Sequence, residues 1–167
     1  LLKGINLEEV KINFFKSEDY LETLKLFIEE VKSQNIDREK VKGSIDFDAY
    51  AYALANGKFY EDLSKSYDRL VEIMNLVKEN IPAFDVLTIN GRAFNNAGAS
   101  IVQELAYTLA AANDYLYNLT QKGIPAHSVG YRTVFAFATG SNYFMEIAKL
   151  RAARLLWTKI MEQYAPK

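Results

Sequence analysis

The chain contains no cysteine, and its 167 residues include a single histidine, His127. The missing thiols exclude disulfides, thiolate metal sites and cysteine nucleophiles, and one histidine excludes a metal site built from several histidines. The formal net charge is only −1, with Lys and Arg interleaved among Asp and Glu, so we expect no binding of nucleic acid. No run reaches the ~18 apolar residues of a membrane span, and no signal peptide is recognisable. These absences predict a cytoplasmic protein without a membrane partner.

What is present is ordinary globular composition, with 50% hydrophobic and 25% charged residues. No linker or low-complexity stretch interrupts the chain, so we expect residues 1–167 to form a single domain. The first residues are Leu1-Leu2-Lys3 rather than a methionine, which suggests a fragment or a processed chain.

The period of the hydrophobic pattern switches repeatedly between two and 3.6, which indicates strands alternating with helices. Strands are predicted at 10–14, 41–47, 86–90 and 133–138. Apolar stripes at helical spacing follow them at 21–31, 63–77, 101–119 and 142–161, and a short apolar stretch covers 49–55. Four strand–helix units in series favour parallel strands joined by right-handed crossovers. Because eight such units close a barrel, we predict an α/β fold that forms about half of a (β/α)8 TIM-type barrel.

Three local features refine this prediction. Ser17 is the expected N-cap of the first helix, with Glu18 and Asp19 at the positive end of its dipole. Ser100 and Gln103 have the spacing of a capping box at the start of the third long helix. The strand at 133–138 is almost entirely apolar and the final helix is apolar nearly all round, so we expect both to be covered on two sides.

Three strings carry a resemblance to a known family: Asn-Asn-Ala-Gly-Ala-Ser at 95–100, Glu-Leu-Ala-Tyr-Thr-Leu at 104–109, and the sixteen residues at 142–157, NYFMEIAKLRAARLLW. They resemble methylmalonyl-CoA mutase, and a weaker similarity extends back to Lys11. The resemblance implies an isomerase that interconverts methylmalonyl-CoA and succinyl-CoA by a radical route. It also implies a barrel around the coenzyme A chain and a separate domain that holds adenosylcobalamin.

The chain departs from the catalytic pattern of that family at three strand ends. Arg92-Ala93 stands where the catalytic chains have Tyr-His, and Ser44-Ile45-Asp46 stands in place of Thr-Ile-Gln. The family's Arg-Leu-Ser pattern keeps its arginine as Arg132, but Val134 replaces the serine. These losses resemble the non-catalytic small subunit, whose partner is the catalytic large subunit. By family position, Arg132, Ser44 and Arg92 are candidate substrate-binding residues, and we expect no catalytic residue and no metal ligand.

The adenosylcobalamin pattern Asp-x-His-x-x-Gly is missing, because Pro125 stands two residues before His127. We therefore expect this chain to lack the cobalamin-binding domain and to bind no cofactor, with adenosylcobalamin held in the parent complex. His127 is interpreted as a solvent-facing or loop-bracing side chain before the fourth strand.

Other interpretations stay open. Arg132 could bind a phosphate, but an internal ion pair with Asp46 or Asp48 is favoured. Those two aspartates would share one face of a strand and could act in acid–base chemistry, although a structural role is favoured. A catalytically competent acyl-CoA mutase of altered substrate range is the alternative function, and an acyl-CoA-binding module is a third. The open edges of a half-barrel also predict that the isolated chain forms a homodimer.

Overall fold

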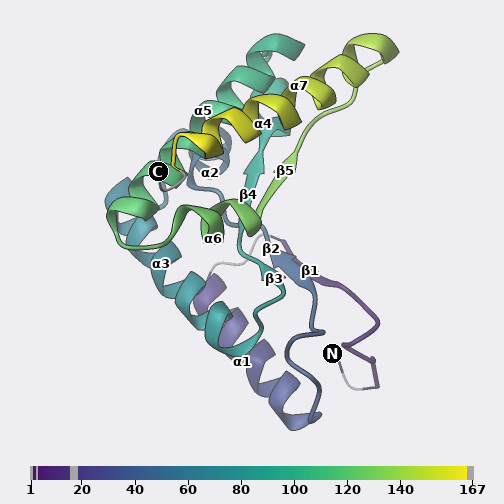
Figure 1. The fold of residues 1–167 in the computed structure, drawn as a ribbon, viewed down its shortest axis with the longest axis vertical. Coiled ribbons are helices and arrows are strands. Elements are labelled where there is room, and N and C mark those ends of the chain that lie inside the picture. Colours follow the sequence, from purple (N-terminus) through teal and green to yellow (C-terminus); the bar gives the residue numbers. More distant parts are fainter. Residues whose placement is uncertain (1, 3, 16–18, 165–167) are drawn as a thin grey trace.

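The computed structural model of the chain describes residues 2, 4–15 and 19–164 (Figure 1). Within them, strands alternate with helices in the order β1 (Ile12–Phe14), α1 (Tyr20–Ser33), β2 (Gly43–Ile45), α2 (Ala49–Asn56), α3 (Leu63–Asn80), β3 (Phe84–Asp85), β4 (Leu87–Asn90), α4 (Gly91–Asn96), α5 (Ile101–Gln121), α6 (Ala126–Tyr131), β5 (Thr133–Ala136) and α7 (Tyr143–Glu162). All predicted strands and helices are present. The short elements α4 and α6 were not predicted, because six residues are too few to show a helical period.

The paired strands are all parallel and form two small sheets, in each of which they follow chain order. β1 pairs with β2 and β2 with β3, whereas β4 pairs with β5. Only Val86 separates β3 from β4, and Thr88 still reaches β2, since its Oγ1 donates to the carbonyl of Ile45 at 3.2 Å. The order β1, β2, β3/β4, β5 with a helix after each strand confirms the α/β class and is that of part of a TIM-like barrel.

The helices form an outer layer in the same order. α1 contacts α3, α3 contacts α5, and α5 contacts α7. Figure 1 shows α5 and α7 beside each other, with α3 below them. None of the helices in the described residues is long and apolar enough to cross a membrane.

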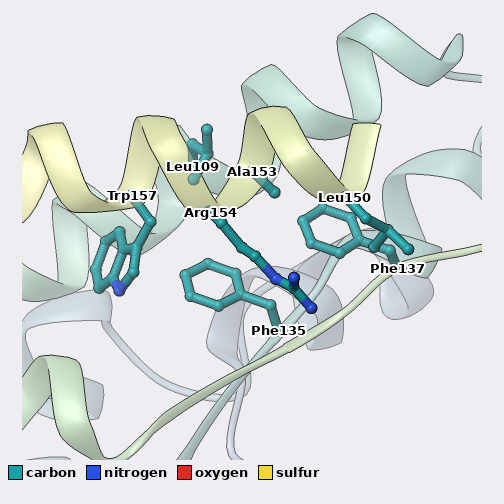
Figure 2. Close-up of a pocket in the computed structure, with 7 residues that line it drawn as sticks. All are labelled: Leu109, Phe135, Phe137, Leu150, Ala153, Arg154 and Trp157. Carbon is teal, nitrogen blue, oxygen red and sulfur yellow. The ribbon is translucent and has the colours of Figure 1, made fainter. Parts of the chain in front are cut away.

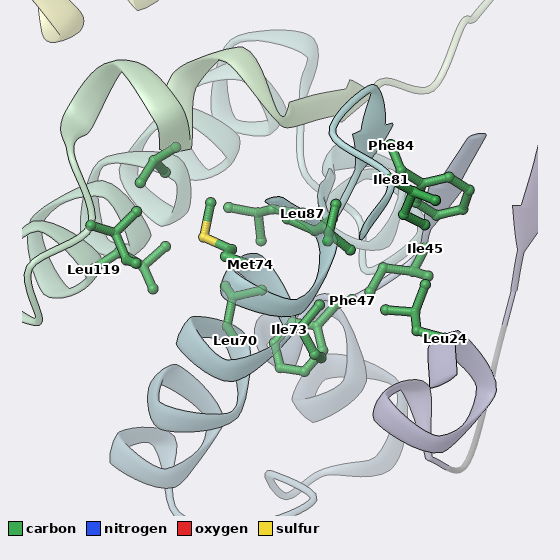
Figure 3. Packing of buried hydrophobic residues seen from close by; sticks show 14 of the residues in the cluster. Leu24, Ile45, Phe47, Leu70, Ile73, Met74, Ile81, Phe84, Leu87 and Leu119 are labelled. Carbon is green, nitrogen blue, oxygen red and sulfur yellow. The ribbon is translucent and has the colours of Figure 1, made fainter. Parts of the chain in front are cut away.

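The hydrophobic core lies between these helices and the strands (Figure 3). Phe14, Phe27 and Phe84 form a cluster of rings with centroids 5.3 to 6.3 Å apart, and so join β1, α1 and β3. Gly43 makes this approach possible: a Cβ there would lie 1.9 Å from the carbonyl oxygen of Ile12 and 2.4 Å from the ring of Phe84. Large, fully buried side chains come from both the strands and the helices, and include Leu24, Ile45, Leu70, Ile73, Phe84, Leu87, Tyr115, Leu116 and Leu119.

The helix caps are partly as predicted. The capping box of α5 is confirmed, because Gln103 N donates to Ser100 Oγ at 3.4 Å and Ser100 N donates to Gln103 Oε1 at 2.9 Å. The N-cap of α1 is Asp19, whose Oδ1 accepts hydrogen bonds from the first turn. Ser17, the predicted N-cap, and Glu18 lie outside the described residues.

Two burial predictions were wrong for the chain by itself. Every residue of β5 is only half-buried, although the strand was expected to be covered on both faces. On α7, Phe144 is 80% exposed and Leu155 is 60% exposed. The physical reason is that, among the described residues, α7 packs mainly against α5, α6 and Phe135 of β5, and β5 pairs with β4 on one side only.

Candidate functional site

The face of the sheet opposite the helices carries polar side chains. The strand register aligns Asn13, Ser44 and Asp85 across β1, β2 and β3. Because successive side chains of a strand point to opposite faces, these three lie on the other side of the sheet from the core residues Ile45 and Phe84. Ser44 Oγ donates a hydrogen bond to Asn13 Oδ1 at 2.8 Å. The predicted binding residue Ser44 therefore belongs to a polar row on the inner face.

Arg132 lies beside the same row. Its Nη1 donates to the carbonyl of Phe84 at 3.4 Å, and its side chain is half-buried. Burial lowers the pKa of Arg132, and the negative charge of Asp85 opposes that fall. Burial also raises the pKa of Asp85, against the positive charges of Lys11 and Arg132. Asp85 is thus aligned with Ser44 in the strand register and lies close enough to Arg132 for their charges to interact. The sequence pattern did not single out Asp85, and its only signal was an acidic residue between the apolar Phe84 and Val86.

The predicted partners of Arg132 are corrected by this arrangement. Within the described part of the chain, Arg132 makes no ion pair with Asp46 or Asp48. Both aspartates lie beyond the end of β2 at Ile45, so they do not share a strand face as expected. Asp48 instead serves as the N-cap of α2, which confirms a structural role for it.

Arg92 lies at a different place, the carboxyl edge of the sheet, where barrel enzymes position their chemistry. It is the second residue of α4 and is exposed, and its Nε donates to Asn90 Oδ1 at 3.1 Å. Ala93 beside it is half-buried and offers only a methyl group. Gly91 allows this turn to sit against its neighbours, since a Cβ there would lie 2.6 Å from Thr108 Oγ1. The three candidate residues are therefore not one site: Ser44 and Arg132 share the inner face, and Arg92 stands apart from them.

Asp48 ties the carboxyl ends of β2 and β4 together. Its Oδ2 accepts a hydrogen bond from the backbone N–H of Asn90 at 2.8 Å. Its Oδ1 accepts from Tyr50 N at 3.0 Å, from Ala51 N at 3.2 Å and from the Tyr115 hydroxyl at 3.2 Å. Burial raises the pKa of Asp48 to about 6, although all four hydrogen bonds oppose that rise.

A buried group of charges braces the next part of the edge, the loop between β5 and α7. Lys149 Nζ lies 2.7 Å from Glu104 Oε2, 2.7 Å from Glu146 Oε2 and 2.6 Å from the carbonyl oxygen of Ala138. Glu104 Oε1 accepts from Ala138 N at 2.7 Å, and Glu146 Oε1 accepts from Gly140 N at 3.1 Å. Glu104, Glu146 and Lys149 stand in the strings that carry the family resemblance, but the sequence pattern assigned them no role. The sequence could have indicated this pairing, because Glu104 and Lys149 stand among apolar residues of their helices, where an unpaired charge is costly.

An apolar hollow of about 250 Å³ opens between β5, α5 and α7 (Figure 2). Figure 2 shows the rings of Phe135, Phe137 and Trp157 and the guanidinium group of Arg154 around it. Phe135 packs edge-on against Trp157, with ring centroids 5.1 Å apart. Arg154 is the one polar residue among the described residues that line the hollow, whereas ligand sites combine several convergent polar groups, so we interpret the hollow as uncovered core surface.

The single histidine of the sequence lies apart from the candidate residues. His127 is exposed on α6, which precedes β5 and so lies at the opposite edge of the sheet from Arg92. It is not in a loop, as predicted, although it does face solvent. Among the described residues, no group of three or more His, Cys, Asp or Glu side chains could hold a metal ion.

Comparison with known proteins agrees with the resemblance in the sequence. The family model described as methylmalonyl-CoA mutase matches residues 1–167. The methylmalonyl-CoA mutase of Rhizobium meliloti is 34% identical over 167 residues, which is 100% of this chain and 24% of that protein. The methylmalonyl-CoA mutase small subunit of Porphyromonas gingivalis is 38% identical over 168 residues, 98% of this chain and 26% of that protein. The large subunit of Streptomyces virginiae is 32% identical over 100% of this chain and 23% of its own length.

The chain therefore spans about a quarter of the length of the curated relatives that it matches. The match covers all three strands that carry Asn13, Ser44 and Asp85, and also the charged group at the β5–α7 loop. With this coverage and the parallel strand–helix units described above, the chain belongs to the methylmalonyl-CoA mutase family.

Proposed function

We propose that the chain is part of the barrel of a small, non-catalytic mutase subunit, which acts in the cytoplasm by pairing with a catalytic large subunit. The observation that carries the proposal is Arg92-Ala93 at the carboxyl edge. The methyl group of Ala93 can neither donate nor accept a hydrogen bond, and Arg92 is held by Asn90. The identity of 38% with a protein named as a small subunit supports the same reading.

The inner face supports it as well. Ser44 donates a hydrogen bond to Asn13, and Arg132 donates one to the carbonyl of Phe84. The carboxylate of Asp85 opposes an anionic acyl-CoA, because like charges disfavour binding. Ser44, Arg132 and Arg92 remain the positions at which any acyl-CoA contact would be sought.

Adenosylcobalamin would supply the radical chemistry elsewhere in the assembly, and one α/β domain of this chain would stabilise the large subunit. The test is to express the intact protein alone and with a catalytic large subunit. We expect co-purification with the large subunit, mutase activity only in the pair, and no stoichiometric absorbance change when the protein alone is titrated with adenosylcobalamin at micromolar concentration. Turnover, or a stoichiometric cobalamin complex, by the protein alone would overturn the proposal.

The alternative is a catalytically competent acyl-CoA mutase of altered substrate range. The retained Arg132, the hydroxyl that Ser44 keeps in place of the family's threonine, and the 34% identity with a protein named as a mutase favour it. A panel of acyl-CoA substrates offered to the intact protein with adenosylcobalamin separates the two functions. We expect no conversion, and Ala93→His should not restore any, because Asp46 and Val134 also differ from the catalytic pattern.

A further inference from the structure

Asp48 is buried where four elements meet. Only 9% of its surface is exposed, and it stands between the end of β2, the start of α2, the end of β4 and α5. Its two oxygens accept hydrogen bonds from α2, from Tyr115 of α5 and from the N–H of Asn90. Since Asn90 is followed at once by α4, this one carboxylate connects α2 and α5 to the turn that positions Arg92.

Among the described residues, each group that hydrogen-bonds to the Asp48 carboxylate is a donor. The backbone N–H groups of Tyr50, Ala51 and Asn90 donate to it, and so does the Tyr115 hydroxyl. The Tyr115 oxygen already accepts a hydrogen bond from Ala49 N at 2.7 Å. A proton added to Oδ2 would therefore point at the N–H of Asn90, and the bond between the two elements would be lost.

The titratable groups around it are phenols rather than cations. Tyr115 comes from α5 and Tyr50 from α2, and the Tyr50 hydroxyl in turn donates to Asp114 at 2.6 Å. Tyr67 of α3 also donates to Asp114. No ion pair involving Asp48 occurs among the described residues, so its charge is stabilised by hydrogen bonds alone.

We propose that Asp48 is a positioning residue that holds the β4–α4 turn in place while its carboxylate is charged, and that protonation of Asp48 releases this turn. The inference rests on the converging donors and holds whether or not the chain is catalytic. It places a conformational device at Arg92-Ala93, where this chain departs from the catalytic pattern of the family.

The pH range follows from the environment of the carboxylate. Burial raises the pKa of Asp48 to about 6. The raised value means that the folded protein takes up this proton more readily than the unfolded chain, so charging Asp48 costs stability as the pH rises towards 6. The hydrogen bond from the N–H of Asn90 lowers the pKa of Asp48, so a state that loses this bond while Asp48 stays buried binds the proton more readily. Protonation therefore favours loss of the bond, and the turn is held above pH 6 and released below it.

Hydrogen exchange of the intact protein tests this directly. Protection factors of the amides of β4 and α4 would be measured by mass spectrometry between pH 5 and pH 8, each relative to the intrinsic exchange rate at that pH. We expect protection at Asn90 to fall about tenfold as the pH is lowered from 7 to 5, because one hydrogen bond to a charged group is lost. In Asp48→Asn, whose amide nitrogen can face the N–H of Asn90, protection should be low at every pH.

Asp62→Asn is the matched control. Asp62 is also an aspartate N-cap, and its Oδ1 accepts from Ser64 N at 2.9 Å within α3 alone. Its replacement should leave protection at Asn90 and the pH profile unchanged. A second test variant, Tyr115→Phe, removes a hydrogen bond that lowers the pKa of Asp48, so the midpoint of the wild-type profile should move to higher pH. A flat wild-type profile, or a midpoint that Tyr115→Phe does not raise, would overturn the proposal even if Asp48→Asn fails to fold.

Discussion

Removing the positive charge of Lys149 should destabilise the protein more than any exposed substitution on the same helix. The side chains of Lys149 and Glu104 are only 1% and 0% exposed, so water cannot replace the lost partner. In Lys149→Met, the carboxylates of Glu104 and Glu146 would face each other without a cation. Breaking a buried ion pair from one side costs about 3–5 kcal/mol, and we expect a loss of that size in the free energy of unfolding.

The structure also predicts a partial rescue. Glu104→Gln removes the stranded charge, and its amide oxygen can still accept from Ala138 N. The double variant with Lys149→Met should therefore be more stable than Lys149→Met alone by about 2 kcal/mol, since a neutral pair of similar volume carries no uncompensated charge. Glu146 keeps its hydrogen bond from Gly140 and is 11% exposed, so it needs no substitution.

Urea unfolding followed by the fluorescence of Trp157 measures these changes on the same helix. Lys159→Met, at an exposed position of α7, is the matched control and should change stability by less than about 0.5 kcal/mol. Equal losses for Lys149→Met and Lys159→Met, or no rescue in the double variant, would refute the reasoning.

The same urea melts, repeated at several pH values, test the direction in which stability changes with pH. The pairing with Lys149 and the N–H of Gly140 lower the pKa of Glu146 from its usual value. A lowered pKa stabilises the folded protein above the ordinary value of the group and loses that contribution as the pH falls through the folded value. The wild type should therefore lose stability on acidification in a step that Lys149→Met lacks.

Three further outcomes are expected. Ser100→Ala should lower the free energy of unfolding by about 1 kcal/mol, against little change for Gln121→Ala, and equal urea midpoints would contradict the capping box. Gly91→Ala should cost about 1–3 kcal/mol in the same assay, because the new methyl group would meet Thr108 and the backbone of β5; an unchanged midpoint would show that the turn can shift. Light scattering of the isolated chain should show a homodimer that covers exposed side chains such as Phe144, whereas a monomer of 19.0 kDa at high concentration would exclude it.

The sequence alone determined the element types because they depend on local pattern. The alternation of Val10, Ile12 and Phe14 predicted β1, and the Ser100–Gln103 spacing predicted the start of α5 to the residue. Long, strongly periodic helices such as α3 were equally clear. The family resemblance was also readable, because it rests on strings of residues rather than on contacts.

Only the tertiary structure decided which charges meet. The sequence pattern favoured an ion pair of Arg132 with Asp46 or Asp48, whereas in the structure Arg132 donates to the carbonyl of Phe84 and feels the negative charge of Asp85. It likewise assigned no partner to Lys149, which meets Glu104 from 45 positions away in the chain. Such pairs depend on register and on helix packing, which no local period encodes. The burial of α7 was overestimated for a related reason. An apolar helix face indicates that the face should be covered, but it does not show which segment covers it.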